Sequence, residues 1–145
     1  MHWTWKSWAQ LTLAELYSIL QLRQAVFVVE QNCPYLDADG EDQQCWHLLG
    51  HKDDELVAYV RVFPPRSTKK DIVIGRVITA HSIRGQGWGR PLMETAEGFA
   101  SRQFGAHSFY LGAQAHLAHF YGSLGYKTCG PAYDEDEIPH LPMRK

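Results

Sequence analysis

Apolar residues recur at helical spacing along several parts of the chain. Between Leu11 and Val28 they return about every third or fourth position, which is the pattern of an amphipathic helix. Thr12 is the expected N-cap of this helix, because Glu15 stands at the position that completes a capping box. Two further helices are expected over Pro91–Arg102 and Leu117–Leu124.

Shorter runs of β-branched and aromatic residues predict strands. Trp46–Gly50 and Leu56–Phe63 are joined by polar residues 51–55, so an antiparallel hairpin is expected there. Further strands are expected over Ile72–Thr79, His107–Gly112, Tyr126–Cys129 and Ile138–Met143. The order combines hairpins with one strand–helix–strand crossover. It therefore predicts an α+β fold whose sheet is mixed and mostly antiparallel, with a parallel pair in the middle.

Composition narrows the possible partners. A chain of 145 residues is expected to form one domain over 1–145, and 45% hydrophobic with 21% charged residues is ordinary for a soluble protein. The net charge of −2 gives no field that would gather a phosphate backbone, so no nucleic acid partner is expected. No apolar stretch reaches about 18 residues and no leader pattern opens the chain, which favours a cytoplasmic protein without a membrane partner.

Cysteines and histidines predict no metal site. Cys33, Cys45 and Cys129 are widely spaced, which favours reduced thiols over a disulfide framework or a metal centre. Residues 31–44 read as a long loop, and loops of this length often have a function. The tryptophans within Met1–Trp8 leave open either a homodimer interface or packing under the first strand.

The segment Arg84-Gly85-Gln86-Gly87-Trp88-Gly89 carries the strongest chemical signal. It follows a predicted strand and precedes a predicted helix. Its glycines let the backbone approach a ligand closely, and the amides of the first helical turn favour an anion. The spacing matches neither the dinucleotide fingerprint nor the P-loop. The segment therefore predicts a phosphate cradle of another kind, to which Arg84 adds a positive charge.

The spacing Arg-x-x-Gly-x-Gly resembles the coenzyme A pyrophosphate loop of the GNAT acyltransferases. Phe120–Tyr126 is similar to that family's Phe-Tyr-x-x-x-Gly-Phe/Tyr segment. Leu22–Gln31, Ala113-Gln114 and Glu135–His140 resemble the ElaA branch of the family. The resemblance covers nearly the whole chain and implies the GNAT fold.

The resemblance implies an N-acyltransferase that uses acetyl-CoA as cosubstrate and transfers the acyl group directly to a primary amine in a ternary complex. The acceptor would be a small molecule or a peptide amine. The coenzyme-binding residues that it implies are Val77, Ile78, Thr79, Arg84, Gly85, Gln86, Gly87, Trp88, Gly89, Gln114 and Tyr121.

The resemblance also implies catalytic roles. Tyr121 would be the general acid, since a phenol with a pKa of about 10 keeps its proton while a thiol of about 8.5 leaves. The alternative for Tyr121 is simple aromatic packing. A main-chain N–H near Ile78 would polarise the thioester carbonyl. The base stays open because Gly75 stands where some members place a glutamate; the candidates are His140, Glu135, Glu30, Asp134 and Glu137.

Two other functions remain open at this point. The missing strand glutamate motivates a coenzyme A-binding sensor or docking module with little turnover. Arg23, Val26-Phe27 and Glu30-Gln31 on the first predicted helix resemble the N-terminal region of the acyl-homoserine lactone synthases, which share the fold. The alternative is that Val26 and Phe27 pack in the core while Arg23 pairs with a nearby carboxylate.

Overall fold

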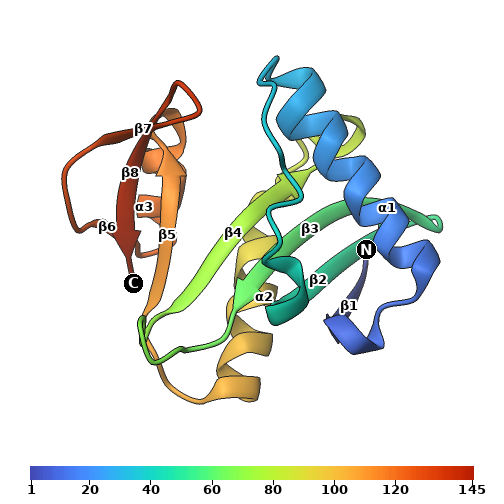
Figure 1. Ribbon diagram of the computed structural model, residues 1–145, viewed down its shortest axis with the longest axis horizontal. Coiled ribbons are helices and arrows are strands. Elements are labelled where there is room, and N and C mark those ends of the chain that lie inside the picture. The colour runs from blue at the N-terminus through green and yellow to red at the C-terminus, as the bar shows by residue number, and fades with distance from the viewer.

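A computed structural model describes residues 1–145. One mixed sheet runs in the order β1-β2-β3-β4-β5-β8-β6, and β7 pairs with β8 (Figure 1). Only the central β4–β5 pair is parallel, which confirms the predicted α+β fold. The strands are β1 (His2–Ser7), β2 (Trp46–Lys52), β3 (Glu55–Phe63), β4 (Ile72–Thr79), β5 (Phe109–Gln114), β6 (Lys127–Thr128), β7 (Tyr133–Glu135) and β8 (Ile138–Arg144).

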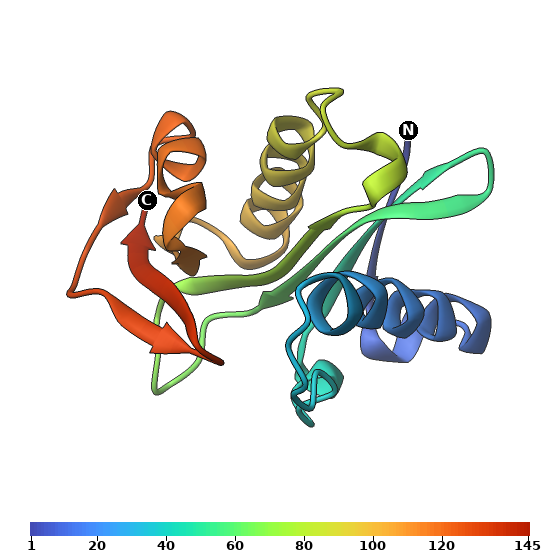
Figure 2. The same cartoon turned by 90° about the horizontal axis from the view of Figure 1, so that it is seen from above.

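Helices cover both faces of the sheet (Figure 2). Helices α2 (Gly89–Phe104) and α3 (Ala118–Ser123) lie on one face, and α1 (Leu13–Arg23) lies on the other. A core cluster of 17 buried residues fills the α2 side, and a second cluster of 5 lies beneath α1. None of the helices combines the length and the hydrophobicity needed to cross a bilayer.

The first helix begins as the sequence predicts. Thr12 Oγ1 accepts a hydrogen bond from the Glu15 N–H at 3.1 Å, and Glu15 accepts one from the Thr12 N–H at 2.8 Å. The α-helix ends at Arg23, and the chain continues as a π-helix, η2 (Gln24–Glu30), which the apolar spacing did not reveal. Val26 and Phe27 pack against the smaller core cluster, as the packing alternative expected.

Two strands were not predicted. In β1, Trp3 and Trp5 pack against the larger core, and Trp5 stacks on Trp46 at 5.4 Å. The sequence also predicted no strand between Cys129 and Ile138, where the structure places β7. The turn to β8 is confined to Asp136 and Glu137, whose φ angles are 51° and 65°. Every residue of β7 is exposed, so no apolar alternation marks it as a strand.

The parallel strands β4 and β5 pair only at their beginnings. Ile72 lies opposite Phe109 and Val73 opposite Tyr110, and no further pair follows. Figure 1 shows the two strands separating toward their C-terminal ends. From residue 74 to 79 the main chain of β4 therefore has no strand partner on this side. We call this region the β4–β5 opening.

Candidate active site

The predicted glycine loop presents a row of free donors at the start of α2. Gly85 and Gly87 adopt φ angles of 76° and 81°, which glycine reaches without strain. No main-chain N–H from Gly85 to Arg90 donates a hydrogen bond within the protein, and Pro91 has none to donate. Free amides at the positive end of a helix dipole are the donors that bind phosphate. The geometry thus agrees with the predicted cradle.

Gly89 brings the third helix to this end of α2. A Cβ on Gly89 would lie 3.0 Å from Cζ of Phe120, so a larger side chain would push α3 away. The next residue of α3 is Tyr121. The local sequence thereby places the predicted general acid on the helix that packs against the loop.

Tyr121 is buried, with 6% of its surface exposed, and its ring packs in the larger core cluster. Its ring contacts those of Phe120 and Tyr126 at centroid distances of 5.1 and 6.0 Å. Burial raises the pKa of the Tyr121 phenol to about 12. The hydroxyl has no hydrogen-bond partner within the protein, so it holds a proton that it can donate to a ligand atom.

Arg84 bridges the C-terminal end of β4 and the end of η2. Its Nε donates to the Thr79 carbonyl at 3.0 Å, and Nη1 donates to Glu30 Oε2 at 2.7 Å. Sequence reasoning placed a cation here but did not foresee that Glu30, one of the candidate bases, would be its ion partner. This pairing occupies the Glu30 carboxylate.

The end of β4 contains a bulge. Tyr59 pairs with Ile78 and Arg61 with Gly75, so two residues of β4 oppose one residue of β3. The side chain of Ile78 is buried beneath α1, while Val77 packs against the larger core. The side chains of these residues therefore pack, as the sequence predicted, and their main chain borders the β4–β5 opening.

His140, Glu135 and Gln114 lie together at the far end of β5. His140 Nδ1 lies 2.7 Å from the Ile138 carbonyl, and Nε2 lies 3.3 Å from Glu135 Oε2. Because a carbonyl only accepts, Nδ1 carries a proton, and in the neutral ring Nε2 holds the lone pair. Gln114 lies opposite His140 in register and donates to Gln31 at 3.4 Å.

Tyr121 and His140, the predicted acid and one candidate base, lie on opposite faces of the sheet at β5. Leu111 and Ala113 face the core that contains Tyr121, whereas Gln114 and its partner His140 alternate to the other face. Asp134 and Glu137, the other candidate bases beyond Glu30, are exposed. The thiol of Cys33 donates to the Asp136 carbonyl at 3.5 Å, so the loop 31–44 meets the β7–β8 turn.

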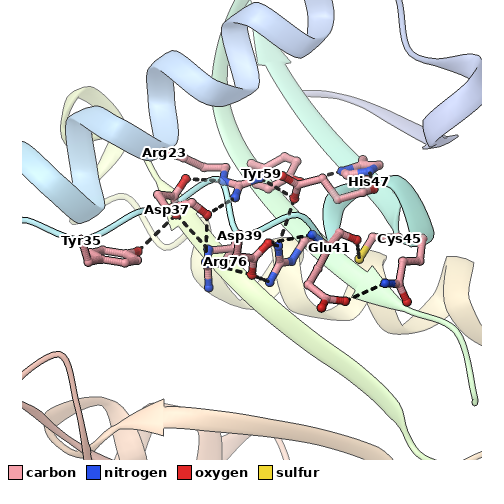
Figure 3. Close-up of polar contacts among 12 residues, drawn as sticks. Arg23, Tyr35, Asp37, Asp39, Glu41, Cys45, His47, Tyr59 and Arg76 are labelled. Carbon is pink, nitrogen blue, oxygen red and sulfur yellow. Dashed lines mark hydrogen bonds and ion pairs between the residues drawn. The ribbon is translucent and has the colours of Figure 1, made fainter.

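Sequence reasoning missed a partly buried ionic cluster that fixes this loop (Figure 3). It contains Arg23, Asp37, Asp39, Asp42, Arg61 and Arg76. Arg23 is fully buried and donates to Asp37 and Asp42, each at 2.7 Å, so the expected pairing of Arg23 with carboxylates is confirmed. Burial opposes the charge of Asp42, yet hydrogen bonds from Arg23 and Arg61 hold its pKa below the usual value. The spacing of the three aspartates within one loop was the available signal.

A profile of the acetyltransferase (GNAT) domain matches residues 23–145. The chain belongs to the GNAT family. It is 45% identical to protein ElaA of Escherichia coli over 139 residues, which are 94% of this chain and 91% of that protein. This agrees with the ElaA-like segments of the sequence.

Solved structures agree with the family. An acyl-CoA N-acyltransferase from Pseudomonas aeruginosa superposes with a TM-score of 0.95 at 45% identity, covering 100% of this chain and 99% of that one. ElaA of Escherichia coli gives a TM-score of 0.93 at 44% identity with the same coverage. An aminoglycoside 6'-N-acetyltransferase complexed with coenzyme A gives 0.74 at 17% identity over 98% of this chain and 96% of that one, which shows the shared fold alone.

Proposed function

We propose that this GNAT protein is an N-acyltransferase that transfers an acetyl group from acetyl-CoA directly to a primary amine. The observation that carries the proposal is the run of free main-chain N–H groups from Gly85 to Arg90 beside the β4–β5 opening. Free donors of this kind match the paired phosphates of the coenzyme.

The residues around the opening fit the rest of the coenzyme. On the side that faces β5, the main chain of Val77, Ile78 and Thr79 has no strand partner, so its groups that point into the opening can hydrogen-bond the amides of the pantetheine arm. Arg84, beside the loop, supplies a positive charge for the pyrophosphate once it exchanges Glu30 for that anion. Gln114, the last residue of β5, would supply a side-chain amide on the far side of the opening, and it contacts Gln31 at 3.4 Å.

The proposed reaction needs a neutral amine, a polarised carbonyl and a proton for the departing thiolate. The amine nitrogen attacks the thioester carbonyl, the C–N bond forms and the C–S bond breaks. Tyr121 donates its proton to the sulfur, and a main-chain N–H near Ile78 polarises the carbonyl. His140, paired with Glu135 on the opposite face of the sheet from Tyr121, accepts through water the proton that the amine loses.

Transfer through an acyl-cysteine is less consistent with the thiols. All three cysteines are free, and burial raises the pKa of Cys45 to about 12. Desolvation and the charges of Asp136 and Glu137 raise the pKa of Cys33. Neither group is an activated thiolate at neutral pH, which favours direct attack by the amine.

Calorimetry with acetyl-CoA and with CoA, followed by thiol-release assays with a panel of primary amines, tests the proposal. We expect both ligands to bind, and thiol release to depend on the amine and to fall at least tenfold in Tyr121→Phe. Binding without turnover for every amine would favour a coenzyme-binding sensor or docking module. Absence of binding by the folded protein would refute the proposal.

A further inference from the structure

A strained residue stands just before the main chain that the proposed function assigns to the coenzyme. Arg76, in the bulge of β4, has a φ angle of 50°. This left-handed region is unfavourable for a residue with a Cβ, and such residues persist only where their surroundings hold them. The same conformation would be unstrained in glycine.

The bulge decides which way the end of β4 faces. Ile72 and Ile74 point into the core on the α2 side, but Ile78 points to the cluster beneath α1. In a regular strand all three would share one face, because side chains alternate with a period of two. The inserted residue reverses the alternation, so it also sets the direction of the main chain of Val77 and Ile78.

The ionic cluster holds Arg76 in this conformation (Figure 3). Its Nε donates to Asp37 Oδ1 at 2.8 Å, and Nη2 donates to the Asp37 carbonyl at 3.1 Å. Asp37 is itself fixed by Arg23 of α1, which donates to its carboxylate at 2.7 Å and to its carbonyl at 2.9 Å. Asp37 of the loop 31–44 thereby connects the bulge of β4 to helix α1.

A second aspartate ties the same guanidinium to β3. Asp39 lies 3.4 Å from Nη2 of Arg76 and accepts paired hydrogen bonds from Arg61 at 2.8 and 2.9 Å. Partial burial opposes the charge of Asp39, yet the hydrogen bonds from Arg61 lower its pKa to about 2. Three arginines and three aspartates balance in charge, so the cluster offers no net charge to a ligand. Its contribution is geometric.

We infer that Arg76 is a positioning residue for acyl transfer. Clamped by Asp37 and Asp39, it holds the bulge that aims the main-chain N–H near Ile78 at the thioester carbonyl. Arg76 acts through the main chain and does not contact the reacting atoms. This inference rests on the proposed N-acyltransferase function.

Three substitutions separate the backbone role from the charge. Arg76→Ala removes the clamp and disfavours the positive φ, whereas Arg76→Gly removes the clamp but adopts that φ freely. Arg76→Lys keeps the charge without the paired hydrogen bonds. Lys70→Ala, at an exposed residue that makes no hydrogen bond in the loop before β4, is the control.

The assay measures thiol release from acetyl-CoA with spermidine, L-lysine and a peptide with a free N-terminus. For Arg76→Ala we expect kcat to fall about 100-fold, because a small misplacement of reacting groups lowers the rate by a factor of this size. The KM for acetyl-CoA should change little. Arg76→Gly should recover about tenfold of that loss, and Lys70→Ala should match the wild type. Thermal melting confirms that each variant is folded at the assay temperature.

Other outcomes overturn the inference. An unchanged kcat in Arg76→Ala would contradict a backbone role, and so would equal losses of kcat in Arg76→Ala and Arg76→Gly. A KM for acetyl-CoA that rises as much as kcat falls would also contradict it. Calorimetry of the wild type separates this failure from that of the proposed function. If the wild type binds neither acetyl-CoA nor CoA, both fail.

One case remains in which the wild type binds acetyl-CoA but none of the three amines is acetylated. The readout is then the ratio of the dissociation constants of CoA and acetyl-CoA, because an N–H aimed at the thioester carbonyl favours the ligand that carries this carbonyl. We expect the ratio to approach one in Arg76→Ala and to return toward the wild-type value in Arg76→Gly. A ratio that is the same in the wild type and both variants would overturn the inference.

Discussion

Protonating one buried histidine should destabilise the fold in a defined pH range. His47 of β2 lies with Nε2 3.0 Å from the Asp42 carbonyl and Nδ1 2.6 Å from the Tyr59 hydroxyl. The carbonyl only accepts, so Nε2 carries the proton and Nδ1 accepts from the phenol. A second proton on Nδ1 would face that phenol hydrogen and create a buried cation.

The size of the effect follows from the pKa. Burial lowers the pKa of His47 from 6.5 to about 4. A difference of about 2.5 between the unfolded and folded states corresponds to about 3 kcal/mol. The unfolded chain binds the proton more tightly, so this stability is complete above pH 6.5, declines as the pH falls from 6.5 toward 4, and is lost below that range.

Urea denaturation between pH 4 and 7.5 measures this loss, with His47→Gln as the control. The glutamine amide can still donate to Asp42, and the carboxylates titrate in both proteins, so the difference between the two curves isolates the imidazole. We expect the advantage of the wild type over the variant to shrink by about 3 kcal/mol across the range. A difference that is independent of pH would refute the assigned tautomer and the burial argument.

Two further predictions concern stability. Thr12→Ala removes the hydroxyl that accepts from the Glu15 N–H at 3.1 Å, so the free energy of unfolding in urea should fall by about 1 kcal/mol without a change in acetyl-CoA affinity. Arg23→Leu leaves Asp37 and Asp42 short of their main partner and should cost about 3 kcal/mol, seen as a lower urea midpoint. A loss below about 1 kcal/mol would mean that Arg76 and Arg61 alone can satisfy both carboxylates.

The elements that the sequence predicted are those whose signal is local. The capping box at Thr12, the strand Ile72–Thr79 and the glycine loop each lie within a few neighbouring residues. Pro139 and Pro142 weaken the local strand signal of β8, yet the strand forms because it pairs with β5, β6 and β7.

What sequence reasoning missed depends on distant contacts. Arg76 and Asp37 are 39 residues apart, and neither residue type is unusual in its own segment. The bulge interrupts a strand of regular β-branched appearance, so the alternation suggested an unbroken strand. The π-helical continuation of α1 likewise keeps helical spacing and leaves no separate mark in the sequence.

The central claim is that the main-chain amides of the glycine loop bind the paired phosphates of coenzyme A. Amide chemical shifts of residues 85–90, followed while the protein is titrated with CoA and separately with pantetheine, test it directly. We expect CoA to shift the amides of Gly85, Gly87 and Gly89 with a single saturating curve, and pantetheine, which lacks the pyrophosphate, to leave them in place. Binding of CoA that leaves these amides unmoved would contradict the account.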